Sequence, residues 1–258
     1  MANEAGEMTN SIAVVNQKGG VGKTTTAINV AAQLASAATP VLIIDLDPQG
    51  NATSGLGVPR QQSLTTYDLL VGGASVAALA QKTSVPHLSV VPANADLAGA
   101  EVELVGRLRR EFVLAAALTD LPYAHVIIDC PPSLGLLTIN GLTGASHVLI
   151  PVQAEYYALE GLSQLLNTIQ AVRGSTNPNL ELLGIVLTMF DKRNSLSEQV
   201  QAEVKNYFGE ALFETLIPRN VRLAEAPSFG QTIFEHDRWS KGARAYKALA
   251  REVKGRLA

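Results

Sequence analysis

The chain of 258 residues is 47% apolar, 17% charged and 5% aromatic, and its formal net charge is −3. This composition excludes an intrinsically disordered chain, and the length suits one α/β domain with a sizeable core. The net charge by itself argues against a protein that binds nucleic acid, although a sum over the whole chain does not say where the charges lie.

Cys130 is the single cysteine, so one chain can supply neither an intrachain disulfide nor a cysteine-rich metal site. We therefore expect a reducing, cytoplasmic environment. Residues 1–10 include acidic side chains and lack an apolar segment, so they do not resemble a signal peptide, and we expect a short, disordered N-terminal extension. The uncharged stretch 130–154 is interrupted by prolines and glycines, which argues against a membrane span.

Short apolar runs rich in Val, Ile and Leu alternate with segments of helical periodicity. The runs predict strands at residues 12–16, 41–45, 88–92, 125–129, 146–152 and 182–188, and the clearest periodic segments predict helices at 24–37, 155–173 and 240–257. This alternation predicts a three-layer α/β fold, with helices on both faces of a mostly parallel, twisted sheet. No repeat or linker divides the chain, so we expect residues 11–258 to form a single domain.

The sequence N-Q-K-G-G-V-G-K-T-T-T at residues 16–26 follows the first predicted strand and opens the first predicted helix. Glycines in this position let successive backbone amides turn toward phosphate oxygens, and the helix N-terminus adds partial positive charge. Lys23 would reach the β- and γ-phosphates, and the Thr24 hydroxyl would bind Mg²⁺. Gln17 stands where the general phosphate-loop pattern has its first glycine, and a second lysine, Lys18, precedes the paired glycines. The other residues expected to contact the nucleotide are Gly19, Gly20, Val21, Gly22 and Thr25.

The segment K-G-G-V-G-K-T-T resembles the deviant Walker A loop of the MinD/ParA class of P-loop ATPases. The resemblance implies a P-loop ATPase domain that uses ATP and Mg²⁺, in which Lys18 acts like an arginine finger. It would cross a dimer interface to contact the partner's nucleotide, with Lys18 and Gly19 at that interface. Positive charge placed in this way stabilises charge on the transferred phosphoryl group, so Lys18 and Lys23 are candidate catalytic residues.

Three aspartates stand at or just beyond the ends of predicted strands, namely Asp45, Asp47 and Asp129. Open α/β sheets bind ligands at this edge, although an isolated aspartate there often only caps a turn or helix. The resemblance implies that Asp47 positions the attacking water. It also implies that Asp45 and Asp129 act on Mg²⁺ through water, with Thr24 as a direct ligand.

Longer blocks at residues 45–57, 151–162 and 217–230 are similar to those of the ParA/Soj-type partition ATPases. By that resemblance Pro218 and Asn220 line the adenine pocket and Glu155 faces the partner subunit near its nucleotide. Without it, Pro218 and Asn220 are more typical of a proline-fixed loop with a turn asparagine. Because only about ten residues precede the first predicted strand, we do not expect the N-terminal helix-turn-helix domain of the larger plasmid ATPases.

Charge is unevenly distributed along the chain. Residues 1–187 hold 8 Lys and Arg against 14 Asp and Glu, whereas residues 188–258 hold 12 against 9. The family binds DNA without sequence preference as an ATP-bound dimer, and the DNA contacts expected here are Lys192, Arg193, Arg219, Arg222 and Lys241. The remaining basic residues of the last helix are also typical of a merely solvated face.

The resemblance thus implies an ATPase, slow alone, that dimerises with ATP, binds nonspecific double-stranded DNA and segregates a chromosome or plasmid. A ParB-like centromere-binding partner would stimulate hydrolysis, and the protein would be cytoplasmic and nucleoid-associated, without a membrane partner. The first alternative is a MinD-like positioning ATPase that cycles on a membrane, although the C-terminal residues poorly match an amphipathic anchor. The second is a metabolic P-loop ligase of the dethiobiotin synthetase type, which needs no lysine that crosses a dimer interface.

Overall fold

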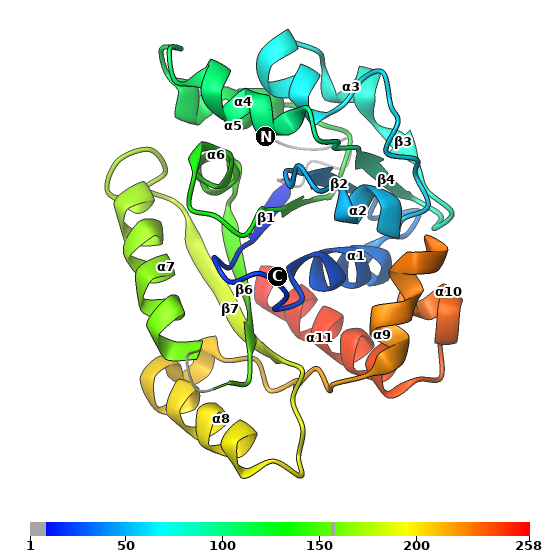
Figure 1. The fold of residues 1–258 in the computed structure, drawn as a ribbon, viewed down its shortest axis with the longest axis vertical. Helices are drawn as coiled ribbons and strands as arrows, with labels where there is room; N and C mark the ends of the chain where they lie inside the picture. The colour runs from blue at the N-terminus through cyan, green and yellow to red at the C-terminus, as the bar shows by residue number, and fades with distance from the viewer. Residues whose placement is uncertain (1–8, 156–157) are drawn as a thin grey trace.

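The computed structural model describes residues 9–155 and 158–258. Within these residues seven strands form one sheet in the order β3-β4-β2-β5-β1-β6-β7 (Figure 1). Every pairing is parallel except the short antiparallel one between β3 and β4. The strands are β1 (Asn10–Val14), β2 (Val41–Asp45), β3 (Gln81–Lys82), β4 (Leu88–Val91), β5 (His125–Asp129), β6 (His147–Gln153) and β7 (Glu181–Thr188).

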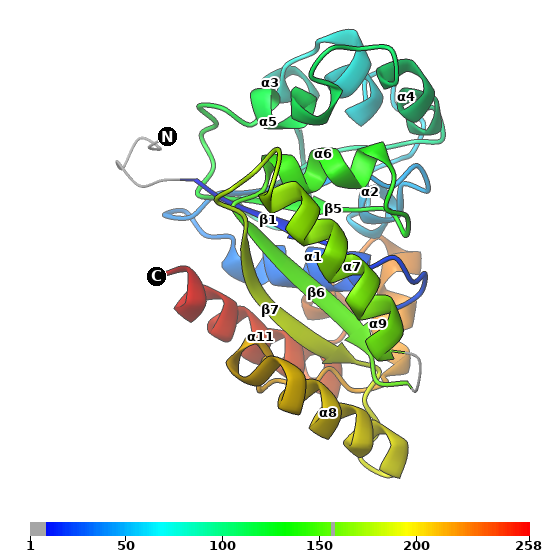
Figure 2. The same ribbon diagram turned by 90° about the vertical axis from the view of Figure 1, so that its left-hand side faces the viewer.

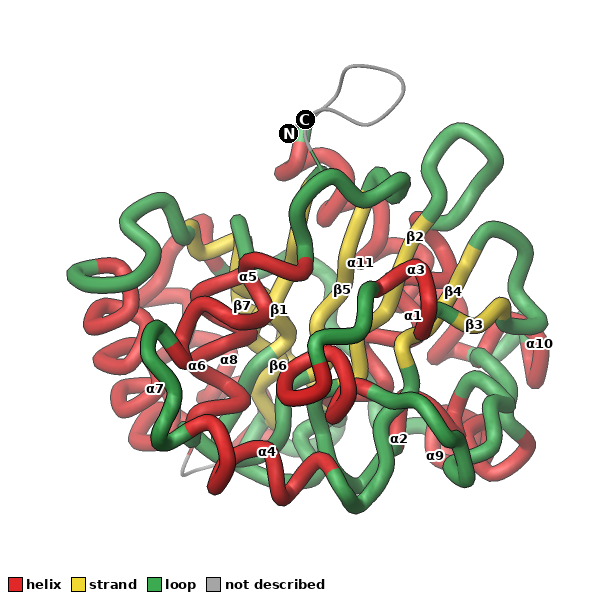
Figure 3. Tube along the Cα trace, turned by 90° about the horizontal axis from the view of Figure 1, so that it is seen from above, coloured by secondary structure: helices red, strands yellow, loops and turns green. Residues whose placement is uncertain are grey.

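Helices cover both faces of the sheet, so the predicted three-layer α/β fold is confirmed. Figure 3 shows the strands in yellow running between helices on either side. The helices are α1 (Lys23–Leu34), α2 (Asn51–Gly55), α3 (Val76–Leu79), α4 (Leu97–Leu104), α5 (Val113–Ala117), α6 (Leu136–Gly144), α7 (Ala158–Arg173), α8 (Ser195–Phe208), α9 (Val221–Glu225), α10 (Ile233–Asp237) and α11 (Lys241–Leu257).

The two faces of the sheet have separate cores because successive strand residues point to opposite sides. In β5, Val126 and Ile128 pack into the core beneath α4 to α8, whereas Ile127 packs into the core beneath α1 and α11. Figure 2 shows α6 and α7 on one side of β1 and β6 and α1 and α11 on the other. Burial on both faces explains why the strands are almost wholly apolar.

Several element boundaries differ from those expected. The first strand runs over Asn10–Val14 rather than 12–16, because Asn16 already belongs to the loop and donates from Nδ2 to the Pro151 carbonyl (2.8 Å). Thr9 and Asn10 belong to the fold rather than to an extension, since Thr9 Oγ1 donates to the Tyr123 carbonyl (2.9 Å). Residues 1–8, the rest of the expected extension, lie outside the described residues.

The three expected helices form, with ends shifted by a few residues. α1 ends at Leu34 rather than at residue 37, and α11 begins at Lys241 because Ser240 is its N-cap, accepting from the Ala243 amide (3.0 Å). α7 is described from Ala158, and residues 156–157 of the expected helix lie outside the described residues. None of the helices in the described part of the chain is long and apolar enough to span a membrane.

Candidate functional site

The loop between β1 and α1 adopts a conformation that requires glycine. Gly20 and Gly22 have φ angles of 75° and 90°, in the left-handed region that side chains with a Cβ rarely adopt. The loop is anchored by Thr188 Oγ1, which donates to the Val21 carbonyl (2.8 Å). Asn16 Oδ1 also accepts from the Lys18 amide (2.9 Å). The predicted phosphate loop therefore has a strand before it, a helix after it and fixed backbone geometry.

The two lysines of the loop lie in different environments. Lys23 is 6% exposed, and its Nζ donates to the Lys18 carbonyl (3.2 Å). Burial lowers the pKa of Lys23, and the nearby Asp129 and Asp47 carboxylates oppose this shift. The Lys18 side chain is 46% exposed and forms an ion pair with Glu155, with 2.8 Å between Nζ and Oε2. Lys23 thus points inward beside the aspartates, whereas Lys18 lies on the surface.

Asp45 and Asp129 end adjacent strands and are direct partners in the register of β2 and β5. The Asp45 carboxylate accepts from the Asp47 amide (3.1 Å), the Thr53 amide (2.9 Å) and the Thr53 hydroxyl (2.7 Å). These bonds lower its pKa, but burial dominates and raises it to about 6. Asp45 therefore fixes the segment from β2 to α2, and its action on Mg²⁺ stays a prediction.

Asp129 is fully buried, and neither of its carboxylate oxygens has a hydrogen-bond partner among the described residues. Its pKa is raised well above the usual range, first by burial and then by the neighbouring Asp45, with the Thr24 hydroxyl and Lys23 acting in the opposite direction. A buried carboxylate without a partner carries a large desolvation penalty, which a cation or its bound water would relieve. The site thus fits a magnesium ion beside Thr24 and Asp129.

A cavity of about 980 Å³ lies at this carboxyl edge of the sheet. It brings together most of the predicted residues, because its lining includes Gly19, Gly20, Gly22, Lys23, Thr24, Thr25, Asp47, Pro218 and Asn220. Lys18, Val21, Asp45, Asp129 and Glu155 are not among its lining residues. The phosphate loop and the 217–228 segment therefore both contribute to the lining of the cavity.

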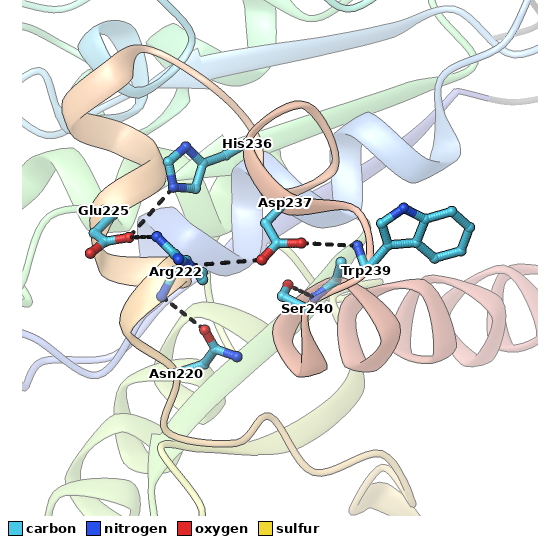
Figure 4. A network of polar contacts seen from close by, with 8 residues as sticks. Asn220, Arg222, Glu225, His236, Asp237, Trp239 and Ser240 are labelled. Atoms are coloured by element: carbon cyan, nitrogen blue, oxygen red, sulfur yellow. Dashed lines mark hydrogen bonds and ion pairs between the residues drawn. The ribbon is translucent and has the colours of Figure 1, made fainter.

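Asp47 and Asn220, which both line the cavity, are each held by a hydrogen bond from a nearby backbone amide. Asp47 is 6% exposed, and its Oδ1 accepts from the Gln49 amide (3.0 Å). Asn220 caps α9, since its Oδ1 accepts from the Arg222 amide (2.8 Å), and its amide nitrogen is directed away from that bond (Figure 4). The Asn220 amide nitrogen is thus available to a ligand even though its oxygen has the structural role expected of a turn asparagine.

Two of the three arginines predicted to contact DNA, Arg193 and Arg222, form ion pairs with carboxylates. Arg193 binds Asp191 through both Nε (3.1 Å) and Nη2 (3.0 Å), which lowers the pKa of Asp191 to about 2. Arg222 binds Glu225 (2.9 Å) and lies 3.8 Å from Asp237, as Figure 4 shows. The other predicted contacts are also exposed, namely Lys192, Arg219 and Lys241.

Some residues of the site were not singled out from the sequence. Thr188 is one, because its bond to Val21 joins positions 167 residues apart. Arg60 is another: it lines the cavity and donates to Asn51 and Ser54 (both 3.1 Å). A lone arginine in a loop belongs to no motif that would indicate its role. Asn51, in contrast, lies in the D-L-D-P-Q-G-N block and could have been proposed from the sequence.

Comparisons with known proteins agree with this arrangement. A sequence model of the family described as "AAA domain" matches residues 9–182. The chain is 54% identical to the chromosome partitioning protein ParA of Caulobacter vibrioides, over 94% of this chain and 92% of that protein. The chain belongs to the ParA/Soj family. It is also 54% identical to the sporulation initiation inhibitor protein Soj of Bacillus subtilis, over 94% of this chain and 97% of that protein.

A solved structure shares the fold and carries a different name. It is described as cobyrinic acid a,c-diamide synthase from Mycobacterium smegmatis with bound ATP analog and magnesium. Its TM-score is 0.83 at 40% identity, and the match covers 95% of this chain and 93% of that one. The ParA/Soj resemblance inferred from the motifs is thus confirmed, as is the P-loop fold.

Proposed function

We propose that this ParA/Soj protein is an ATP hydrolase whose ATP-bound dimer binds double-stranded DNA without sequence preference. Dimer formation and release would drive chromosome or plasmid segregation with a ParB-like partner that stimulates hydrolysis. The observation that carries the proposal is that the two loop lysines lie in different places. Lys23 is buried beside the aspartates, whereas Lys18 lies on the surface and outside the cavity lining. The known relatives at 54% identity support the partition role.

The residues of the cavity have distinct roles in this proposal. Backbone amides at Gly20, Gly22 and Thr24 bind the phosphates, and Lys23 stabilises negative charge on the γ-phosphate. Thr24 and Asp129 would hold Mg²⁺, which supplies further positive charge to the phosphates. Asp47 orients a water molecule whose oxygen attacks the γ-phosphorus while the bond to the ADP oxygen breaks. The products are ADP and inorganic phosphate.

The dimer completes the active site because Lys18 does not line the cavity of its own chain. A Cβ at Gly19 would meet no atom of the described residues within 4 Å, so the loop surface at this position leaves space for a second chain to approach. Lys18 of each chain would then contact the γ-phosphate of the other, with Glu155 nearby. Doubling the basic residues in a dimer raises DNA affinity steeply, which makes DNA binding depend on ATP.

A metabolic synthetase is the second candidate, and the name of the M. smegmatis structure favours it. Such an enzyme would need an acceptor small molecule in the cavity and no lysine that crosses a dimer interface. The two candidates differ in a measurable property, because only the partition ATPase requires ATP-dependent binding to DNA.

The experiment is a gel retardation assay of the full chain on an arbitrary duplex with ATP, ADP or no nucleotide, at two salt concentrations. ATP-specific, salt-sensitive binding without sequence preference is the expected result. No DNA binding with ATP would contradict the proposal. Sedimentation with anionic liposomes in ATP tests the membrane-cycling alternative, and pelleting there without DNA binding would favour it.

A further inference from the structure

The outer face of α11 carries basic side chains in a continuous row. They are exposed and recur every three or four residues, so they lie on one side of the helix: Lys241, Arg244, Lys247, Arg251 and Lys254. We name these five residues the α11 basic face. From Lys241 to Lys254 the row is about 20 Å long, given a rise of about 1.5 Å per residue.

Acidic neighbours do not neutralise this face. None of the ion pairs found in the described part of the chain involves any of its five residues. The one acidic residue of α11, Glu252, binds the backbone amides of Glu214 (2.9 Å) and Thr215 (3.0 Å) instead. Arg256 is likewise turned toward the protein, where it donates to the carbonyls of Leu183 and Glu210 (both 2.8 Å).

A helix face that is merely solvated usually mixes charges of both signs. α8 of the same chain shows this arrangement, with Glu198, Glu203 and Lys205 exposed on it. The α11 basic face carries one sign only, and its field therefore favours a polyanion.

The opposite side of α11 excludes insertion into a lipid surface. Its apolar residues are buried in the core beneath α1 and β7, as Tyr246, Leu249 and Val253 illustrate. Tyr246 is also hydrogen-bonded to Thr26 of α1 (3.1 Å). An amphipathic helix that binds membranes must present its apolar side to the lipid, which α11 cannot do while the protein is folded.

We propose that the α11 basic face binds the phosphate backbone of double-stranded DNA and supplies much of the salt-dependent affinity. A row of about 20 Å spans about six phosphates along one strand. The face begins at Lys241, which directly follows Ser240 in the chain, and Figure 4 shows Ser240 beside the network in which Arg222 is held by Glu225 and Asp237. Because Arg193 and Arg222 are paired with carboxylates, the unpaired cations of α11 are better placed to replace counterions. This inference rests on the proposed DNA-binding function and adds to it the surface that carries the charge.

The test compares two double variants with equal changes in net charge. Lys247→Gln with Arg251→Gln neutralises the middle of the face, and Lys82→Gln with Lys205→Gln neutralises two exposed lysines on β3 and α8. Binding of a fluorescent 30-base-pair duplex is measured by anisotropy in ATP over a series of salt concentrations. Thermal unfolding and ATP hydrolysis without DNA check that each variant is folded.

We expect the α11 variant to bind about tenfold more weakly or worse, and its plot of log K against log salt to lose about 0.9 in slope per contact removed. The control should bind like the wild type. Equal affinity and slope for the two variants would overturn the inference while leaving the proposed function intact. If the wild type fails to bind DNA in ATP, both the proposed function and this inference are wrong. ATP-dependent binding to anionic vesicles but not to DNA would likewise overturn both of them.

Discussion

Lys18 and Glu155 form an ion pair within one chain, with 2.8 Å between Nζ and Oε2. Both side chains are nearly half exposed, at 46% and 43%, so the pair contributes at most about 1 kcal/mol to stability. A lysine held this weakly can leave Glu155 and bind the phosphate oxygens of a nucleotide that is bound to a second copy of the chain. The ion pair therefore keeps Lys18 ordered in the monomer without preventing its proposed role in the dimer.

Replacing Lys18 with alanine should separate nucleotide binding from hydrolysis. Lys18→Ala should bind ATP within about threefold of the wild type, since Lys18 lies outside the cavity lining, but should hydrolyse it about 10³-fold more slowly. Lys23→Ala, in contrast, should lose nucleotide binding. Equilibrium binding of a fluorescent ATP analogue and phosphate release measure the two properties.

Mixing two inactive variants tests whether Lys18 acts across the interface. In a heterodimer of Lys18→Ala and Asp47→Ala, one of the two sites has both Asp47 of its own chain and Lys18 of the other. An equal mixture should therefore recover up to about a quarter of wild-type turnover if the subunits exchange freely. No recovery, with heterodimers shown to form, would place Lys18 in its own chain's site instead.

Valine in place of Gly19 or of Gly22 should have different effects on the protein. Within the described part of the chain, a Cβ at Gly19 meets no atom within 4 Å, so Gly19→Val should leave the monomer's thermal midpoint unchanged and block only dimer formation in ATP. Gly22 has a φ of 90°, and Gly22→Val should destabilise the monomer by about 1–3 kcal/mol. Unfolding curves and sedimentation velocity distinguish them, and an ATP-bound dimer of Gly19→Val would exclude close approach at this position.

The buried carboxylates predict that stability falls as pH rises. A carboxyl with a raised pKa holds its proton more tightly in the folded protein than in the unfolded chain, so unfolding releases protons. For Asp45, whose pKa is raised to about 6, the loss occurs between its usual value near 3.8 and pH 6. The pKa of Asp129 is also raised, so the stability that this carboxyl contributes is lost as the pH rises through its raised pKa.

Asp129→Asn should consequently stabilise the nucleotide-free protein at pH 8, by on the order of 2 kcal/mol, because it removes a buried charge whose desolvation outweighs the opposing effects of Thr24 and Lys23. The gain should shrink at pH 5, and the extra stability conferred by ATP with Mg²⁺ should fall. Urea unfolding at both pH values measures this, with the exposed Glu203→Gln as the control. If ATP with Mg²⁺ raises the free energy of unfolding of Asp129→Asn as much as that of the wild type, then Asp129 does not bind the metal.

Local pattern predicted the parts of the fold that are specified locally. β2 and β5 have the expected bounds because each is a run of buried aliphatic residues that ends in an aspartate. β3 was not predicted, since Gln81 and Lys82 form a polar, two-residue edge strand defined only by its pairing with β4. α8 was also missed, although Asn194 at its N-cap and the spacing of Val200 and Val204 could have indicated it.

The residues of the candidate site can likewise be divided into those that a local sequence motif predicts and those that only the fold brings together. The phosphate loop was predictable because its glycines and lysines lie within a short segment whose chemistry depends on order alone. Pro218 and Asn220 were expected only from the family resemblance, because nothing in the local pattern brings residues 217–228 to the same cavity as the phosphate loop. The Thr188 contact with Val21 likewise depends on the packing of β7 beside the loop. The approach of Arg222 to Asp237 also required the structure, since the two residues are 15 positions apart in the sequence.

A buried hydrogen bond links the helix of the phosphate loop to the helix of the α11 basic face. Tyr246 of α11 and Thr26 of α1 have hydroxyl oxygens 3.1 Å apart, and both residues are at most 1% exposed. Burial raises the pKa of Tyr246, so its hydroxyl stays protonated at physiological pH. Tyr246→Phe should lower the free energy of unfolding by about 1–2 kcal/mol, because the Thr26 hydroxyl loses its partner in a dry environment.

The control is Tyr207→Phe, which makes the same chemical change at a tyrosine that is 71% exposed and should leave stability within about 0.5 kcal/mol of the wild type. Urea unfolding without nucleotide measures both variants. Repeating it with ATP and Mg²⁺ shows whether the bond also serves the cavity, whose lining includes Tyr246. Equal stability of the two variants would mean that packing alone, and not the hydroxyl pair, joins α1 to α11.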